Sequence, residues 1–249
     1  MEFQDKVVMI TGAGSGIGRA AALLYAQGGA QVVVSDINPK GGEETVKLIT
    51  EAGGKASFIA ANVAKLDEVE QLVNNVVEQY GKLDVAVNNA GIGDFQQKKT
   101  AEHPIDSWDR VIAVNQTGVF YCMKQELQQM MKQKSGSIVN ISSIAGIRGL
   151  PNNLAYVASK HAVVGMTKTA AMEYAKHGIR INAVCPVFTL TNLFKPEYFG
   201  DKAEKLREGI PMKRYGSADE IAEAIIWLST DKASFVTGHI MSVDGGKTA

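Results

Sequence analysis

Tyr156 and Lys160 are four residues apart and have the side chains needed to move a proton to or from a carbonyl oxygen. The unperturbed pKa of a phenol, about 10, is too high for acid–base chemistry at neutral pH, and a nearby ammonium lowers it by favouring the phenolate. On a helix, a spacing of four places both side chains on one face. Because Tyr198 and Lys202 have the same spacing, spacing alone does not choose between the two pairs.

The surroundings of the two tyrosines favour Tyr156 as the acid–base residue. A strand-like run that ends in Ile141-Ser142-Ser143 precedes Tyr156. A serine at the carboxyl end of such a strand faces the ligand crevice of an open α/β sheet, where it can hold a substrate carbonyl. Tyr198 follows no strand and has Gly200 inside its would-be helix. The sequence therefore predicts the chemical site around Tyr156.

A glycine-rich stretch, Thr11-Gly-Ala-Gly-Ser-Gly-Ile-Gly18, follows a short apolar strand and opens a helix. Such glycines let the backbone approach a pyrophosphate, and free N–H groups at the helix start favour its charge. The familiar G-x-G-x-x-G does not fit, because Ile17 stands where its last glycine would be. The pattern present is T-G-x-x-x-G-x-G, with Gly12, Gly16 and Gly18, and it predicts a dinucleotide phosphate cradle.

Asp36 ends the second predicted strand, where a carboxylate accepts hydrogen bonds from both hydroxyls of the adenosine ribose. The same carboxylate would repel a 2′-phosphate. Neither Ser15 nor Ile37 supplies the cation that an NADP site needs, so the sequence predicts NAD(H). The alternative interpretation of Asp36 is a turn residue before Asn38-Pro39.

The elements that position these residues alternate along the chain. Short β-rich runs predict strands over 6–11, 31–35, 56–60, 83–88, 137–142, 180–184 and 239–243, and helical patterns predict helices near 17–28, 40–52, 66–80, 106–132, 154–176 and 218–230. This order predicts an α/β fold, a single-domain doubly wound (Rossmann) parallel sheet of about seven strands with helices on both faces. Residues 1–249 form that domain, with an aromatic, proline-bearing insertion at about 186–216 that is either a substrate loop or a packed surface excursion.

Composition excludes several kinds of partner. With 26 basic and 26 acidic residues the formal charge is zero, so nothing indicates nucleic acid or a membrane surface. No apolar stretch approaches the roughly 20 residues that span a bilayer, and the start has no signal-peptide pattern. Two cysteines far apart, Cys122 and Cys185, fit a reducing cytoplasm, with Cys122 expected to be a small buried residue. We expect a cytoplasmic protein and no metal site.

Together, these motifs closely resemble the short-chain dehydrogenase/reductase family, in its compact branch of about 250 residues, over essentially the whole chain. The motifs that match are Thr11-Gly12…Gly16…Gly18, Asn88-Asn-Ala-Gly91, Asn115, Ser143, Tyr156…Lys160, Asn182-Ala-Val-Cys-Pro186 and Val243-Asp-Gly-Gly246. The resemblance implies hydride transfer between NAD(H) and a small-molecule ketone or secondary alcohol, as in NAD-dependent carbonyl reductases and alcohol dehydrogenases. It also implies a homotetramer, built partly by pairing the helices near 106–132 and 154–176.

The resemblance assigns roles to four catalytic residues. Tyr156 matches the general acid/base, and Lys160 matches the residue that lowers the tyrosine pKa and binds the nicotinamide ribose. The family's serine lies thirteen residues before the tyrosine, which selects Ser143 over Ser142 as the group that polarises the carbonyl. Asn115 matches the residue that supports a water-mediated proton relay to the lysine.

The resemblance also implies the cofactor contacts, with Thr191 at the nicotinamide carboxamide. The full set is Gly12, Ser15, Gly16, Ile17, Gly18, Asp36, Ile37, Asn62, Val63, Asn89, Ala90, Gly91, Tyr156, Lys160, Pro186, Thr189 and Thr191. Two positions depart from the family pattern. Asn62 replaces a more usual Asp beside the adenine, whose amino group its carbonyl can still bind. Val187 replaces a usual glycine, so the loop on the nicotinamide side is expected to run differently.

The substrate is inferred from apolar residues near the predicted site. Candidate pocket walls are Ile144, Leu150, Leu154, Phe188, Leu190, Phe194 and Tyr198, which favour an apolar slot, while Arg148 and Lys195 are the candidates for binding a carboxylate. Reductases of 3-oxoacyl groups on acyl carrier protein are one alternative, although Met172 stands where they typically have an arginine before Glu173. Steroid and sugar-alcohol dehydrogenases are another. A non-catalytic NAD-binding regulator, or an epimerase or dehydratase on the same scaffold, would be a different class of function.

Overall fold

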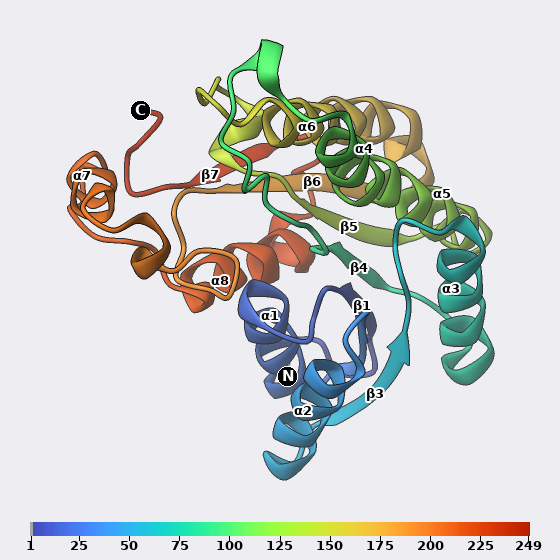
Figure 1. The fold of residues 1–249 in the computed structure, drawn as a ribbon. Coiled ribbons are helices and arrows are strands. Elements are labelled where there is room, and N and C mark those ends of the chain that lie inside the picture. The colour runs from blue at the N-terminus through green and yellow to red at the C-terminus, as the bar shows by residue number, and fades with distance from the viewer. Residues whose placement is uncertain (1) are drawn as a thin grey trace.

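Seven parallel strands form one sheet at the centre of the molecule, in the order β3-β2-β1-β4-β5-β6-β7 (Figure 1). The computed structural model describes residues 2–249. The strands are β1 (Val7–Thr11), β2 (Gln31–Asp36), β3 (Lys55–Ala60), β4 (Val85–Asn88), β5 (Gly136–Ile141), β6 (Ile179–Pro186) and β7 (Ile240–Val243). The predicted doubly wound sheet of about seven strands is confirmed, since the chain builds outward from β1 in one direction and then from β4 in the other.

Helices cover both faces of this sheet, as predicted. The α-helices are α1 (Gly16–Gln27), α2 (Pro39–Glu51), α3 (Leu66–Tyr80), α4 (Ile105–Ile112), α5 (Gly118–Gln133), α6 (Leu154–Tyr174), α7 (Lys202–Glu208) and α8 (Ala218–Ser229). Helices α1, α2 and α8 pack on one face and α3, α5 and α6 on the other. Within residues 2–249, no helix has both the length and the apolar composition needed to cross a membrane.

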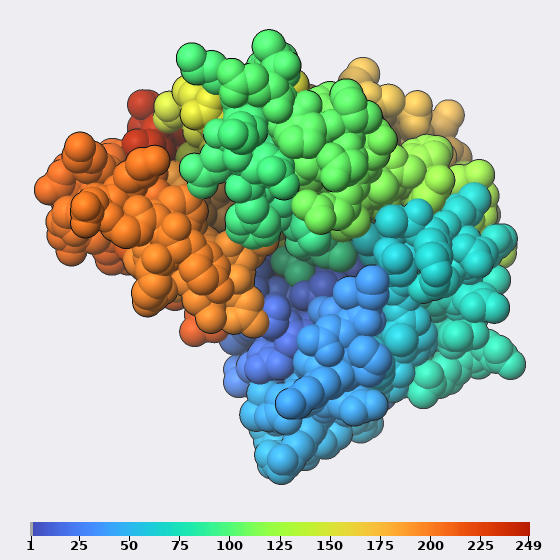
Figure 2. Space-filling view, viewed as in Figure 1, coloured from blue at the N-terminus to red at the C-terminus, as the bar shows by residue number. Residues whose placement is uncertain are grey.

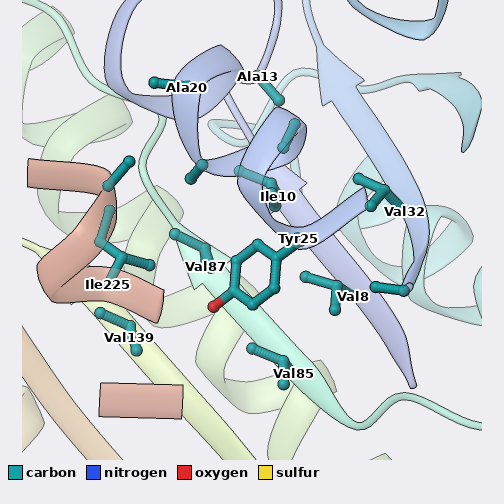
Figure 3. Packing of buried hydrophobic residues seen from close by; sticks show 14 of the residues in the cluster. Val8, Ile10, Ala13, Ala20, Tyr25, Val32, Val85, Val87, Val139 and Ile225 are labelled. Atoms are coloured by element: carbon teal, nitrogen blue, oxygen red, sulfur yellow. The ribbon is translucent and has the colours of Figure 1, made fainter. Parts of the chain in front are cut away.

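Strand β1 has apolar side chains on both of its faces, which suits a strand in the middle of the sheet. Val8 and Ile10 point into the core beneath α1 and α8, and Val7 and Met9 point into the core beneath α3, α5 and α6. All four are buried, as expected for a parallel strand covered on both faces. In Figure 3 the Tyr25 ring of α1 lies among valines of several strands, and its hydroxyl is hydrogen-bonded to the buried Ser229 hydroxyl of α8 at 2.5 Å.

The helix ends follow the signals in the sequence. The Asn38 side chain accepts a hydrogen bond from the Gly41 N–H at the start of α2, with Pro39 as the first helical residue. Ser217 and Glu220 form a capping box on α8. Gly81 ends α3 in the left-handed region, where a residue without Cβ has no steric penalty.

Two segments differ in detail from the sequence-based expectation. The single helix expected over 106–132 contains a π-helical turn, Ala113–Thr117, between α4 and α5. A π turn inserts one residue into the helix, and no simple period in side-chain type announces it. The insertion at about 186–216 is also more ordered than expected, because it contains a 3₁₀ turn, Pro196–Phe199, and helix α7.

A buried polar network joins the carboxyl ends of β4 and β5 to α5 and α6. The Asn88 amide donates to Glu126 Oε2 and to Asn140 Oδ1, each at 3.0 Å, and the Asn140 amide donates to Thr167 Oγ1 at 2.9 Å. Glu126 is fully buried, and burial raises the pKa of its carboxyl from 4.5 to about 8. The network ends one residue before Asn89 and Ile141, which both take part in the site described below.

Glu126→Gln is expected to flatten the dependence of stability on pH. The folded protein holds the Glu126 proton more tightly than the unfolded chain, because its pKa is raised from 4.5 to about 8. The contribution of Glu126 to the free energy of unfolding is therefore complete below about pH 4.5 and falls as the pH rises toward 8. Chemical denaturation from pH 5 to 9 measures this fall. The exposed Glu70→Gln should keep the wild-type slope, and an unchanged slope in Glu126→Gln would contradict the assignment.

Candidate active site

The carboxyl ends of β1 and β4 meet at the point where the strand order reverses, which is where open α/β sheets bind their ligands. Asn89 joins the two ends, because its Nδ2 donates to the backbone oxygens of Thr11 and Gly12, each at 3.0 Å. The Thr11 hydroxyl in turn accepts from the backbone N–H groups of Asn89 and Ala90, each at 3.2 Å. The predicted glycine loop and the predicted Asn88–Gly91 turn therefore lie side by side.

The glycine loop has the geometry of a phosphate cradle. A Cβ on Gly12 would lie 2.8 Å from the Ala90 Cα, and one on Gly18 would lie 2.4 Å from the Gly12 oxygen, so both positions need glycine for close packing. The Ser15 side chain makes no capping hydrogen bond with α1. The N–H groups of the first turn, at Gly16 and Ile17, are therefore free to bind an anion. These features fit the pyrophosphate of a dinucleotide.

Asp36 lies beside this cradle with its carboxylate fixed by two backbone groups. Its Oδ2 accepts from the Gly14 N–H at 2.8 Å and its Oδ1 from the Asn38 N–H at 2.9 Å. Each carboxylate oxygen keeps further acceptor capacity, which fits a pair of ribose hydroxyls. Ile37, the next residue, is 68% exposed and adds no charge.

Arg19 is a cation near the cradle that the sequence analysis did not consider. Its guanidinium donates to the backbone oxygens of Gly14 and Gly41 and to the Thr45 hydroxyl, which itself donates to Ala13 O. These bonds tie the glycine loop to the start of α2. The position directly after Gly18, on the first turn of α1, is the only signal in the sequence that would have indicated this role.

Ser143, Tyr156 and Lys160 come together at the end of β5. Ser143 follows the strand, and its Oγ accepts from the Ala145 N–H at 3.1 Å, which leaves its own proton free to donate. The Ser143 side chain lies close enough to the Tyr156 hydroxyl to act on its pKa. Lys160 is buried, its Nζ lies 5.7 Å from the centre of the Tyr156 ring, and it donates to Ile141 O at 2.8 Å. The competing pair is not built this way: Tyr198 is 60% exposed in a 3₁₀ turn, and α7 only begins at Lys202.

Burial controls the electrostatics of this pair. It lowers the pKa of the Lys160 ammonium from 10.5 to about 8, so the group still carries its charge at neutral pH. It also raises the pKa of the Tyr156 hydroxyl, and the nearby Ser143 side chain opposes that rise. Burial outweighs the contribution of Ser143.

Asn115 lies in the π turn between α4 and α5 and is fully buried. Its carboxamide accepts from the Ile92 N–H and donates to the Ile92 oxygen, both at 2.8 Å, and contacts the Ser159 hydroxyl at 3.4 Å. A Cβ on Gly91 would lie 3.3 Å from Asn115 Oδ1 and 3.6 Å from Lys160 Nζ. Asn115 therefore fixes the backbone after β4 next to the lysine, where the resemblance places it.

The insertion lies across the carboxyl ends of the strands. Phe194 is buried among the rings of Phe188, Phe199 and Tyr215, with ring centres 5.0 to 5.1 Å apart. A Cβ on Gly16 would lie 3.2 Å from the Thr191 side chain, so the insertion reaches the glycine loop. Figure 2 shows the surface hollowed between this orange segment, the blue N-terminal elements and the green segment that follows β4.

The remaining predicted residues divide into two groups. Ile144 is buried and packs with Val187 and Ile210, while Leu150 and Leu154 are partly buried near the start of α6. Leu190 and Tyr198 are 48% and 60% exposed, so they lie at the surface of the insertion and do not form buried walls.

On the cofactor side, Val63 is buried against Gly118 and Pro186 is buried at the end of β6. Asn62 Oδ1 already accepts from the Ala64 N–H at 3.0 Å and keeps a second lone pair. Thr189 is buried with its hydroxyl donating to Val187 O at 2.8 Å. Val187 keeps a negative φ and places its side chain in the small apolar cluster with Ile144, which is how the backbone accommodates a residue other than glycine there.

The segment after β4 contains an ion pair that the sequence analysis missed. His103 Nε2 lies 2.6 Å from Asp94 Oδ2, both side chains are buried, and the hydrogen bond to Asp94 raises the pKa of His103. Ser107 also donates to Asp94, at 3.4 Å. The pair links the two ends of the segment between β4 and α4, because Asp94 lies near its start and His103 near its end. An acid and a histidine nine residues apart in an irregular segment give no periodic signal, so the sequence offered little warning.

Comparison with known proteins places the chain among oxidoreductases along its whole length. A family model described as Enoyl-(Acyl carrier protein) reductase matches residues 12–248. Cyclohexanol dehydrogenase of Acinetobacter sp. is 45% identical, over 100% of this chain and 97% of its own. The 3-oxoacyl-(acyl-carrier-protein) reductase of Thermotoga maritima is 42% identical, over 99% of each chain.

Solved structures agree with these relatives. The crystal structure of levodione reductase superposes with a TM-score of 0.95 at 37% identity, over 98% of each chain. The NAD⁺-bound structure of a xylitol dehydrogenase superposes with a TM-score of 0.93 at 33% identity, over 99% of this chain and 100% of its own.

Proposed function

Because this chain belongs to the short-chain dehydrogenase/reductase family, we propose that it is an NAD(H)-dependent oxidoreductase that interconverts a ketone and a secondary alcohol. One observation carries the proposal. Ser143, Tyr156 and the buried Lys160, whose Nζ lies 5.7 Å from the centre of the Tyr156 ring, lie at the same end of the sheet as the glycine cradle and Asp36. A proton donor for a carbonyl oxygen and a binding site for a hydride carrier therefore share one crevice.

The chemistry needs one hydride and one proton. The glycine loop and Asp36 would hold NAD(H), which when bound would supply a hydride for the carbonyl carbon or accept one from the alcohol. The Ser143 hydroxyl donates a hydrogen bond to the substrate oxygen and keeps its proton, and this bond stabilises the negative charge that develops there. Tyr156 gives its hydroxyl proton to that oxygen as the C=O π bond opens, and Lys160, charged below about pH 8, stabilises the phenolate that remains. Asn115 holds the backbone beside Lys160, where a proton can return from solvent.

Tyr156→Phe is expected to lower kcat by about 10²- to 10⁴-fold, the usual contribution of general acid–base catalysis. Loss of one hydroxyl leaves the cradle intact, so NADH should bind as before, which fluorescence titration checks. Tyr198→Phe is the matched control, because Tyr198 has the same spacing to a lysine but lies at the surface. Near-wild-type kcat in Tyr156→Phe, with cofactor bound, would show that another group moves the proton.

The preference for NAD over NADP rests on charge at the ribose. The Asp36 carboxylate is fixed by two N–H groups and would lie against a 2′-phosphate. The nearby Arg19 guanidinium is occupied by Gly14 O, Gly41 O and Thr45, so it is not free to neutralise that phosphate. The NAD⁺-bound structure of the xylitol dehydrogenase supports the same choice.

We expect NADH to exceed NADPH in kcat/KM by at least on the order of tenfold, from repulsion between like charges. The double substitution Asp36→Asn and Ile37→Arg should lower or invert the ratio of kcat/KM with NADH to kcat/KM with NADPH, because it removes the carboxylate and adds a cation. Glu51→Gln, at the far end of α2, removes a carboxylate without touching the cradle and should leave the ratio unchanged. A wild-type protein that works better with NADPH would overturn the assignment.

The apolar surroundings of Ser143 favour an uncharged substrate. Ile144, which follows Ser143 directly, packs with Val187 and Phe188 in a small apolar cluster, and the Phe188 ring contacts that of Phe194. The 45% identical cyclohexanol dehydrogenase is named for a cyclic secondary alcohol. A 3-oxoacyl thioester on acyl carrier protein is the second candidate, favoured by the 42% identical reductase. Parallel assays with cyclohexanone and acetoacetyl thioesters distinguish the two.

We also propose that the chain assembles as a homotetramer. A groove of about 890 Å³ runs between α5 and α6, with Phe120 and Met131 among its apolar residues and Lys124, Lys132 and Glu173 as its charged ones. A second copy related by a two-fold axis would cover the apolar residues and bring the lysines of one chain toward Glu173 of the other. Such an isologous contact accounts for a half-exposed Phe120 on the α5 surface.

Phe120→Asp is expected to convert tetramers into smaller species, since it places a charge in the groove that the second copy would cover. Light scattering after size exclusion, at several protein concentrations, measures the mass. Leu66→Asp, an exposed apolar-to-acid change at the start of α3, is the control and should keep the wild-type mass. A wild-type protein that is monomeric at every concentration would contradict the proposal.

A further inference from the structure

Three consecutive residues at the end of β5 each lie against a part of the catalytic pair. The Ile141 oxygen accepts from Lys160 Nζ at 2.8 Å, and the Ser143 side chain lies close enough to the Tyr156 hydroxyl to lower its pKa. Between them, the Ser142 hydroxyl donates to the backbone oxygen of Lys160 at 2.9 Å. Of the three residues, Ser142 is thus the one that bonds to the backbone of α6, whereas the other two contact side chains of that helix.

This bond is built into the packing around it. Ser142 is buried, and a Cβ on Gly146 would come within 2.3 Å of Ser142 Oγ and 2.6 Å of the Lys160 oxygen. Only glycine at 146 therefore leaves room for the two atoms to meet. A carbonyl oxygen has two lone pairs, so Lys160 O can accept from Ser142 in addition to the helical N–H.

Cys185 lies near this contact on the neighbouring strand, β6. Burial raises the pKa of its thiol, and the nearby Ser142 side chain and Ser143 backbone oppose that rise.

We propose that Ser142 is a positioning residue that fixes the register of α6 against β5. Apolar contacts between a helix and a sheet are not directional and tolerate small shifts along the helix axis. A hydrogen bond to one helical carbonyl does not tolerate them. Since Tyr156 lies one turn before Lys160 on the same helix, the bond sets the distance of both side chains from Ser143. The kinetic consequence rests on the proposed function, whereas the effect on Lys160 does not.

Ser142→Ala should lower kcat by about 2- to 12-fold, the range that corresponds to one neutral hydrogen bond, while the NADH dissociation constant stays the same. It should also raise the pKa of Lys160 from about 8 toward its ordinary value, because a looser helix admits water to the ammonium. NMR titration of ¹³Cε-lysine-labelled protein, with the Lys160 signal assigned by Lys160→Met, measures that pKa without any substrate.

Ser137→Ala is the matched control, because Ser137 is a buried serine of the same strand whose hydroxyl has no hydrogen-bond partner. It should leave kcat and the pKa of Lys160 unchanged. The proposal is overturned if Ser142→Ala keeps both values, if Ser137→Ala changes them equally, or if only the melting temperature falls. If the wild-type protein transfers no hydride to any carbonyl, the proposed function fails, and the lysine titration still decides the role of Ser142.

Discussion

The joint between β1 and β4 is the contact on which the site depends. Asn89 Nδ2 bonds two successive backbone oxygens of the glycine loop, and the Thr11 hydroxyl accepts two N–H groups in return. This close approach is possible only because Gly12 has no Cβ, which would lie 2.8 Å from the Ala90 backbone. The joint holds the glycine loop against β4, whose continuation at Ile92 is fixed by the Asn115 carboxamide, so the proposed cofactor binding and proton transfer share one rigid frame.

Burial performs two tasks at the chemical site. It excludes water from Lys160, which strengthens the electrostatic contacts of that ammonium. It also shifts both pKa values, downward for the lysine and upward for the tyrosine. A phenol with a raised pKa is a weaker acid, so the proposed oxidation needs the hydroxyl of Ser143 and the charge of Lys160 to favour the phenolate. Ser143 comes from the end of β5 and Lys160 from α6, which is why the packing of this helix against the strand matters.

The sequence predicted the sheet, its helices and their approximate ends, because a strand buried on both faces and a capped helix leave local patterns such as Val7–Thr11 and Ser217–Glu220. It did not predict contacts between residues far apart. Glu126 lies on the apolar stripe of α5 with Met123, Leu127 and Met130, and a carboxyl in that position was the available sign of a buried polar network. The rise that burial causes in the Tyr156 pKa had no sign in the sequence, because solvent exposure is a property of the folded chain.

The two serines after β5 show how position in a strand separates roles that sequence type cannot. Ser142 and Ser143 carry the same hydroxyl, and a count of residues to Tyr156 chose between them only through resemblance to a family. In the structure, the alternation of side chains along an extended backbone sends one hydroxyl to the Lys160 carbonyl and the next to the Tyr156 side chain. A site of this kind needs both hydroxyl contacts, because the position of a proton donor depends on the position of the helix that carries it. Under the two proposals, chemistry and register are therefore set by adjacent residues of one strand, and a change at either serine is expected to alter the same proton transfer by a different route.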